Sequence, residues 1–149
     1  MKKNKPSYGG SLVKGKRKTT RPLCCKRLHH FVLKSKRRDL YQYRVLFERE
    51  LHRWAKKFHL RVYDIAVNHT HIHFTLYIPE KGNYLAFIRS FTGLLARKLG
   101  KGLWSLLPFS RILSWGRDYE RTKKYLQKNR EQAQEKHFLE QVNQILSSS

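Results

Sequence analysis

The densest chemical signal in the chain is the segment Asn68-His69-Thr70-His71-Ile72-His73-Phe74. Residues 71–78 are predicted to form a strand, so His71 and His73 project from one face, about 6 to 7 Å apart. Two neutral imidazoles at this separation can bind one divalent cation. A bare His-x-His is weak evidence for a metal, because histidines also occur as ordinary polar members of a strand face. A pairing that uses His69 in place of His73 also stays open.

A second reactive group lies in the predicted C-terminal helix, residues 118–145. Tyr125 and Asn129 are four residues apart and therefore share one helical face. The neighbours of the phenol are cationic and favour its phenolate form, which can attack phosphorus; they are Lys123, Lys124, Lys128 and Arg130. Tyr125 could instead cover the core with its ring. Tyr119 is the alternative nucleophile, but it is flanked by two acidic residues that disfavour both a phenolate and a nearby phosphate.

The charge of the chain points to a polyanionic partner. Its 149 residues include 33 Lys+Arg and 10 Asp+Glu, which gives a formal net charge of +23 at pH 7. Nucleic acid is the usual partner of so basic a chain. Residues 1–21 contain no acid and are predicted to be a flexible basic arm. The candidate DNA-binding residues are Lys14, Lys16, Arg17, Lys18 and Arg21 in this arm, and Arg117, Arg121 and Lys124 in the helix.

Other composition signals restrict the compartment. No apolar run approaches the roughly 18 residues of a membrane span, and no secretory signal follows the basic start. Cys24 and Cys25 are adjacent, which suits neither an ordinary disulfide nor a metal knuckle. We therefore expect a cytoplasmic protein that does not bind membranes.

The elements that must position these residues follow from hydrophobic periodicity. The pattern predicts strand 23–34, helix 40–58, strands 60–67 and 71–78, helix 84–99, strand 109–115 and helix 118–145. This is the split βαβ order of a ferredoxin-like α+β domain, here expected over residues 22–146. We predict an antiparallel sheet with helices on one face and a C-terminal helix that carries the nucleophile.

A hydrophobic residue between two histidines on a strand, followed by a helix with Tyr and an amide residue four positions later, resembles the HUH-type single-tyrosine transposases. The resemblance is to the IS200-like and REP-associated groups and covers about residues 22–130. It assigns His71-Ile72-His73-Phe74 to the family's histidine motif, Tyr125 to its nucleophile and Asn129 to its third metal ligand, which is commonly Gln.

The resemblance implies a specific activity. Such enzymes cleave single-stranded DNA, often beside a hairpin, with Mg²⁺ or Mn²⁺, and form a 5′-phosphotyrosine intermediate. It also implies a place at the nucleoid and makes a homodimer possible, since some members act as dimers and others as monomers.

A non-catalytic nucleic-acid-binding module of the RNA-recognition type is the competing hypothesis, because such modules share the same element order. It predicts paired exposed aromatics on the central strands. The predicted strand 71–78 instead carries His71, His73 and Thr75 on that face, which favours the enzyme. A domesticated or inactive transposase is a third option.

Overall fold

The computed structural model describes residues 22–149, and its elements follow the predicted order. They are β1 (Leu28–Lys34), a 3-10 turn (Leu40–Tyr43), α1 (Arg44–Lys57), β2 (Arg61–Val67), β3 (His71–Tyr77), α2 (Lys81–Leu99), β4 (Phe109–Ile112) and α3 (Arg117–Ser147). The predicted helix 40–58 therefore begins as a 3-10 turn. The first strand begins at Leu28 rather than at residue 23, because residues 25–27 form a turn and a bend.

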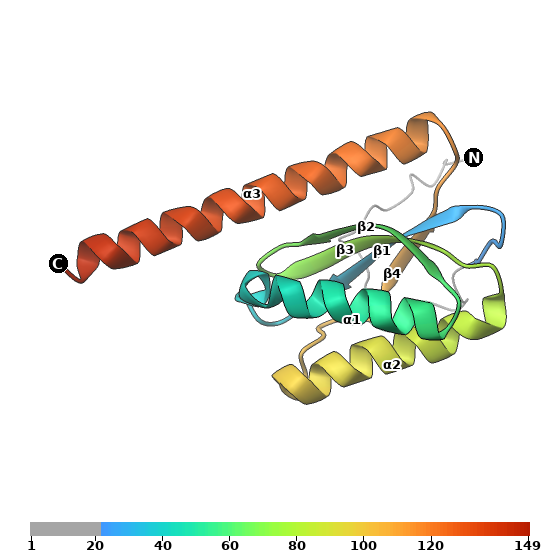
Figure 1. Ribbon diagram of the computed structural model, residues 1–149, viewed down its shortest axis with the longest axis horizontal. Coiled ribbons are helices and arrows are strands. Elements are labelled where there is room, and N and C mark those ends of the chain that lie inside the picture. The colour runs from blue at the N-terminus through green and yellow to red at the C-terminus, as the bar shows by residue number, and fades with distance from the viewer. Residues whose placement is uncertain (1–21) are drawn as a thin grey trace, which may run out of the picture.

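The four strands form one antiparallel sheet in the order β2-β3-β1-β4. Helices α1 and α2 cover one face of this sheet, and α3 crosses the opposite face (Figure 1). The two central strands, β1 and β3, are thus covered on both sides. The predicted α+β fold, with a separate C-terminal helix, is confirmed.

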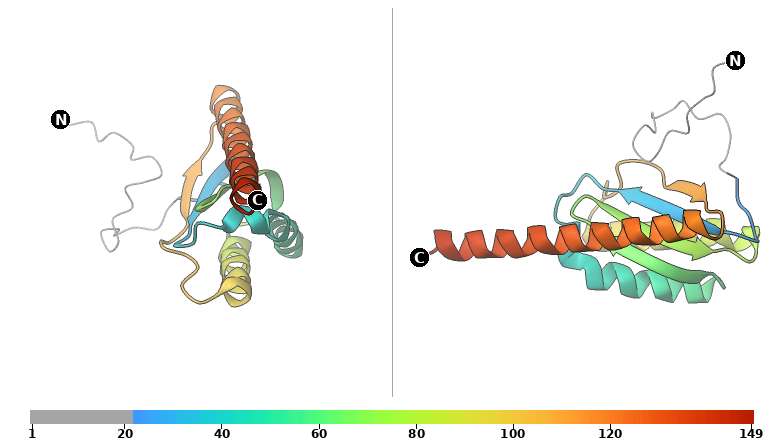
Figure 2. Two further views of the ribbon diagram at one scale, coloured as in Figure 1. Left: turned by 90° about the vertical axis from the view of Figure 1, so that its left-hand side faces the viewer. Right: turned by 90° about the horizontal axis from the view of Figure 1, so that it is seen from above.

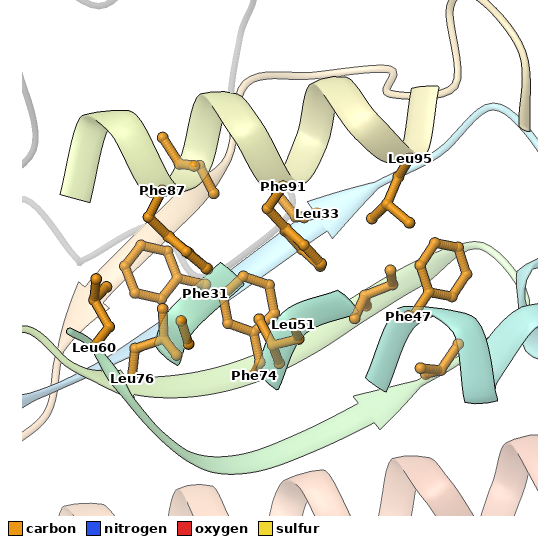
Figure 3. Close-up of a cluster of buried hydrophobic side chains, with 14 of the residues drawn as sticks. Phe31, Leu33, Phe47, Leu51, Leu60, Phe74, Leu76, Phe87, Phe91 and Leu95 are labelled. Atoms are coloured by element: carbon orange, nitrogen blue, oxygen red, sulfur yellow. The ribbon is translucent and has the colours of Figure 1, made fainter. Parts of the chain in front are cut away.

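The hydrophobic core lies between the sheet and the helices α1 and α2 (Figure 3). Phe31 of β1 stacks on Phe74 of β3 with ring centroids 5.3 Å apart, and Phe91 of α2 meets Phe74 edge-on at 5.9 Å. Side chains of a strand alternate between faces, so the neighbours of these phenylalanines, His30 and His73, project toward α3. The aromatic core therefore fixes which face carries the histidines.

One irregularity in β2 interrupts the regular alternation of its side chains. Strict alternation places Val62, Asp64 and Ala66 on one face, but the register of β2 against β3 shifts between Val62 and Asp64. A bulge at this position re-aims the side chains that precede it. Val62 consequently packs against the core together with Ile65, which strict alternation would place on the opposite face.

The fourth strand is shorter than predicted. It ends at Ile112, because the chain turns through Gly116 at a φ of 85° and Ser114 N–H donates to the Asp118 carboxylate at 2.8 Å. Trp115 lies on this turn and is 52% exposed. The end of β4 therefore presents a large aromatic ring at the surface.

Helix α3 has two halves with different surroundings. Its first half buries Thr122, Leu126, Asn129 and Ala133 against the sheet. Its second half projects beyond the rest of the molecule (Figure 2). No helix among residues 22–149 combines the length and the apolar character needed to cross a membrane.

Candidate functional site

A cleft of about 940 Å³ opens between the sheet and the first half of α3. Its lining comes from β1, β3, β4 and α3. The polar and charged members that matter for chemistry are His30, Lys34, His71, His73, Arg111, Asp118, Arg121, Thr122 and Tyr125. The structure thus gathers His71, His73, Arg121 and Tyr125, four of the residues that the sequence singles out, around one space.

The two histidines of β3 lie side by side and nearly perpendicular, with ring centroids 4.7 Å apart. His71 Nδ1 lies 3.0 Å from Thr70 Oγ1, and His73 Nδ1 lies 3.1 Å from His30 Nε2. His73 Nε2 is buried and has no hydrogen-bond partner among the described residues. A histidine that ligates a metal has this arrangement, with one ring nitrogen held by a neighbour and the other open.

Burial keeps these imidazoles neutral. Desolvation is the largest cause that lowers the pKa of His73 to about 2 and the pKa of His30 to about 4. The charges of His71, His30 and Lys34 lower the pKa of His73 further. Burial also lowers the pKa of His71, whereas a hydrogen bond with the Asn129 side chain raises it. The neutral ring is the form that binds a metal, so the site suits a cation at neutral pH.

Asn129 of α3 is buried, with 7% of its surface exposed, and interacts with His71. Its Oδ1 accepts a hydrogen bond from Asn68 Nδ2 at 3.2 Å, and its Nδ2 donates to the Tyr125 carbonyl oxygen at 3.0 Å. Within residues 22–149 no three His, Cys, Asp or Glu side chains converge on a common metal position. Asn129 is also absent from the cleft lining, so the two imidazoles are the candidate ligands that the cleft itself presents.

Tyr125 stands over the histidines on the exposed side of α3. Its ring meets His73 edge-on with centroids 5.3 Å apart and lies 6.3 Å from His30. The side chain is 49% exposed, whereas Leu126 beside it is fully buried. Leu126 therefore serves as the core residue of this turn, and Tyr125 faces the cleft.

Tyr119, the alternative nucleophile, does not line the cleft. Its ring packs edge-on against Tyr63 and Trp115 instead. Burial is the first cause that raises the pKa of Tyr119, followed by the charges of Asp64 and Glu120. A phenolate is thus less accessible at Tyr119, in keeping with its lower rank in the sequence analysis.

The predicted DNA-binding residues are divided among three places. Arg121 lines the cleft, whereas Arg117 and Lys124 are exposed on α3 outside it. The arm residues Lys14, Lys16, Arg17, Lys18 and Arg21 lie outside the described residues. Arg111 of β4 joins Arg121 in the cleft, where Arg111 donates to Asp118 at 3.0 Å and to Thr122 at 3.2 Å.

His30 and Lys34 are site residues that the sequence reasoning missed. No motif in the sequence marks His30, yet it bonds His73 directly. The signal lies in strand pairing: β1 runs antiparallel beside β3, with His30 opposite Thr75 and Val32 opposite His73. Because β1 and β3 are the central pair of the predicted fold, this register would have placed His30 next to His73.

His69, the alternative partner in the histidine pair, lies elsewhere. Its Nε2 is 3.1 Å from the Ala133 carbonyl oxygen, and its ring stacks on Tyr41 at 5.3 Å. It is buried and absent from the cleft lining. The geometry therefore favours His71 and His73 as the pair.

Comparison with known proteins gives similarity in structure only. No protein-family model matches the chain, and no curated protein matches it in sequence. The structure of a REP-associated tyrosine transposase bound to a REP hairpin is similar with a TM-score of 0.57 and 13% identity, covering 74% of this chain and 70% of that one. A proposed transposase from Deinococcus radiodurans is similar with a TM-score of 0.51 and 16% identity, and the match covers 78% of this chain and 98% of that one. The resemblance seen in the sequence thus holds at the level of architecture: this chain has the fold of the tyrosine transposases.

Proposed function

We propose that the chain is a metal-dependent DNA strand transferase of the single-tyrosine transposase type. The observation that carries this proposal is the position of Tyr125, half-exposed on α3 with its ring 5.3 Å from the buried His73. The fold shared with a REP-associated tyrosine transposase supports the same activity.

The proposed reaction transfers one phosphodiester bond. The Tyr125 oxygen attacks a phosphorus atom of the single strand, forming an O–P bond as the bond to the 3′ oxygen breaks. The phenol proton passes through water to the leaving oxygen, so the products are a 5′-phosphotyrosine and a free 3′-hydroxyl. Attack by a 3′-hydroxyl on the phosphotyrosine reverses these changes, and rejoining needs no external energy.

The residues around Tyr125 have distinct parts in this scheme. His71, His73 and Asn129 would hold Mg²⁺ or Mn²⁺, and such an ion polarises a phosphate as a Lewis acid. Two imidazole donors favour Mn²⁺ over Mg²⁺, which is harder and prefers oxygen ligands. Arg111 and Arg121, which line the same cleft, offer positive charge to the phosphate oxygens.

Single-stranded DNA with a hairpin is the proposed partner. The net charge of +23 favours a polyanion, and the structurally similar REP-associated transposase was solved with a hairpin. Arg117 and Lys124, which are exposed on α3 outside the cleft, would contact the flanking backbone, and the basic residues of the arm would do the same through their positive charge. The proposed place of action is therefore the nucleoid.

A second copy of the chain is a further proposed partner. The projecting half of α3 exposes four large apolar side chains, namely Phe138, Leu139, Ile145 and Leu146. This half also carries little positive charge, so two copies could meet here without strong repulsion.

The non-catalytic RNA-recognition hypothesis fits the site less well. Such modules stack bases on aromatic rings of the two central strands. Here the face of β1 and β3 opposite the core presents His30, His71 and His73, and α3 crosses it (Figure 1). The cleft beside this helix therefore offers imidazole rings on the central strands and not the paired exposed aromatics of such a module.

Covalent trapping on a denaturing gel tests the proposed reaction. The chain is incubated with Mn²⁺ and a pool of labelled single-stranded hairpin DNAs, beside the variants Tyr125→Phe and Tyr119→Phe and a chelator control. We expect a shifted band for the native chain and for Tyr119→Phe, and none for Tyr125→Phe or with chelator. An adduct that survives in Tyr125→Phe would refute the assigned nucleophile. Salt-sensitive binding without any adduct, across a pool that contains the cognate hairpin, would favour the binding module.

A further inference from the structure

Three aromatic rings gather where α3 begins, and the proposed reaction uses none of them. Tyr63 comes from β2, Trp115 from the turn after β4, and Tyr119 from the first turn of α3. Their ring centroids lie 5.7 to 6.5 Å apart in every pairing. Trp115 is 52% and Tyr63 44% exposed. We call these three residues the aromatic corner.

The aromatic corner is held in a fixed orientation. The rings meet at interplanar angles of 60° to 85°, the edge-to-face arrangement that aromatic side chains prefer. The Trp115 indole N–H also donates to the Lys26 carbonyl oxygen at 3.3 Å. A rigid ring loses little conformational freedom when a ligand stacks on it, so this exposed surface is pre-organised for binding.

Charges of both signs surround the aromatic corner: Asp64 and Glu120 act on Tyr119 and raise its pKa, whereas basic side chains lie beside Trp115. Arg117 is exposed between Trp115 and Tyr119 in the chain, and Lys26, whose carbonyl oxygen accepts the Trp115 hydrogen bond, is also exposed. On α3, Arg121 and Thr122 line the cleft between Tyr119 and Tyr125. Six residues of helix span roughly 9 Å along the axis and turn about 240°, so Tyr119 lies on a different side of α3 from Tyr125, and a strand that reaches both must pass around the start of the helix.

We propose that the aromatic corner stacks an unpaired base of the DNA strand that enters the cleft. The proposal rests on the proposed function for the identity of the ligand. Bases in a duplex already have their faces covered by neighbours, whereas an unpaired base presents a face to an aromatic side chain. The corner would thereby select single strands over duplexes at the point of cleavage. Tyr119 is then a binding residue and not a second nucleophile.

Tryptophan fluorescence tests this stacking separately from cleavage. Of the three tryptophans, Trp115 is exposed while Trp54 and Trp104 are part-buried, so a base stacked on Trp115 should quench a distinct part of the emission. The chain without metal is titrated with three probes of equal length: oligothymidylate, an abasic strand with the same phosphates, and a duplex. The variants are Trp115→Phe, Trp115→Ala and the matched control Trp54→Phe, which lies on α1, across the sheet from α3 (Figure 1).

We expect oligothymidylate to quench the native chain and Trp54→Phe, and to leave Trp115→Phe nearly unchanged. Trp115→Ala should bind oligothymidylate roughly 10-fold more weakly or worse, and should bind the abasic strand as the native chain does. Equal quenching by the abasic strand or the duplex would overturn the proposal, because phosphates alone would then explain the contact. Equal affinity of Trp115→Ala for oligothymidylate would overturn it as well. If Tyr125 adducts still form in either case, only the stacking fails and the proposed function stands.

Discussion

At the scale of single residues, the hydrogen bond between His30 Nε2 and His73 Nδ1 is the contact that orders the site. It measures 3.1 Å and is buried, and it leaves His73 Nε2 as a ring nitrogen without a partner in the described chain. A held ring keeps its second nitrogen aimed at one point, which raises its affinity for a metal. In the proposed metal site, His30 would therefore be a positioning residue that acts through His73.

We expect His30→Leu to weaken Mn²⁺ binding about 10- to 100-fold, the usual cost of losing a partner behind a ligating histidine. His30→Gln keeps a polar group near His73 and should recover part of the affinity. Titration of Mn²⁺ followed by the electron paramagnetic resonance of the free ion measures this. His52→Gln, an exposed histidine on α1, is the control. Equal affinity in His30→Leu, with the fold intact by circular dichroism, would exclude the positioning role.

At the scale of elements, the order of strands and helices follows from periodicity, whereas the boundaries depend on contacts between distant residues. His71, His73 and Tyr125 fall on elements that the sequence pattern finds, and all three line the cleft. The bulge beside Tyr63 and the early end of β4 could not be predicted in this way. They depend on the pairing of β2 with β3 and on the bond from Ser114 to Asp118.

The junction of β4 with α3 is expected to depend on Asp118. Burial raises the pKa of this carboxyl, but Ser114 N–H and Arg111 together hold it below its usual range. Asp118 also lies in the first turn of α3, where a negative charge interacts favourably with the helix dipole. Losing these contacts in Asp118→Ala should lower the free energy of unfolding by about 1–2 kcal/mol.

Urea unfolding at neutral pH measures this effect, with Glu120→Ala as the matched control. Glu120 lies in the same first turn but is exposed and forms none of the ion pairs found among residues 22–149. The variant Glu120→Ala should lower the free energy of unfolding by less than about 0.5 kcal/mol. Equal losses in the two variants would assign the effect to the helix dipole alone and would exclude a special part for the bonds to Ser114 and Arg111.

At the scale of the whole molecule, the charge is distributed unevenly along the chain. Residues 131–149 hold three glutamates and one lysine, in a chain whose net charge is +23. This segment forms the end of α3 that projects past the sheet (Figure 2). An end with a slight negative charge is poorly suited to follow DNA. It is, however, the part of α3 where two copies could approach with the least repulsion.

We expect the native chain to form a dimer through this end, because its exposed apolar residues recur at helical spacing. Phe138 and Ile145 are seven residues apart, and so are Leu139 and Leu146. Seven residues make about two helical turns, so the four side chains lie on one stripe of the helix. Burial of such a stripe against a second copy removes apolar surface from water.

Light scattering after size exclusion should therefore give about twice the 17.9 kDa of one chain. The double variant Leu139→Glu with Leu146→Glu should give a monomer, whereas Leu85→Glu, at an exposed leucine of α2, should stay dimeric. A native chain that remains monomeric at every concentration tested would rule out this interface.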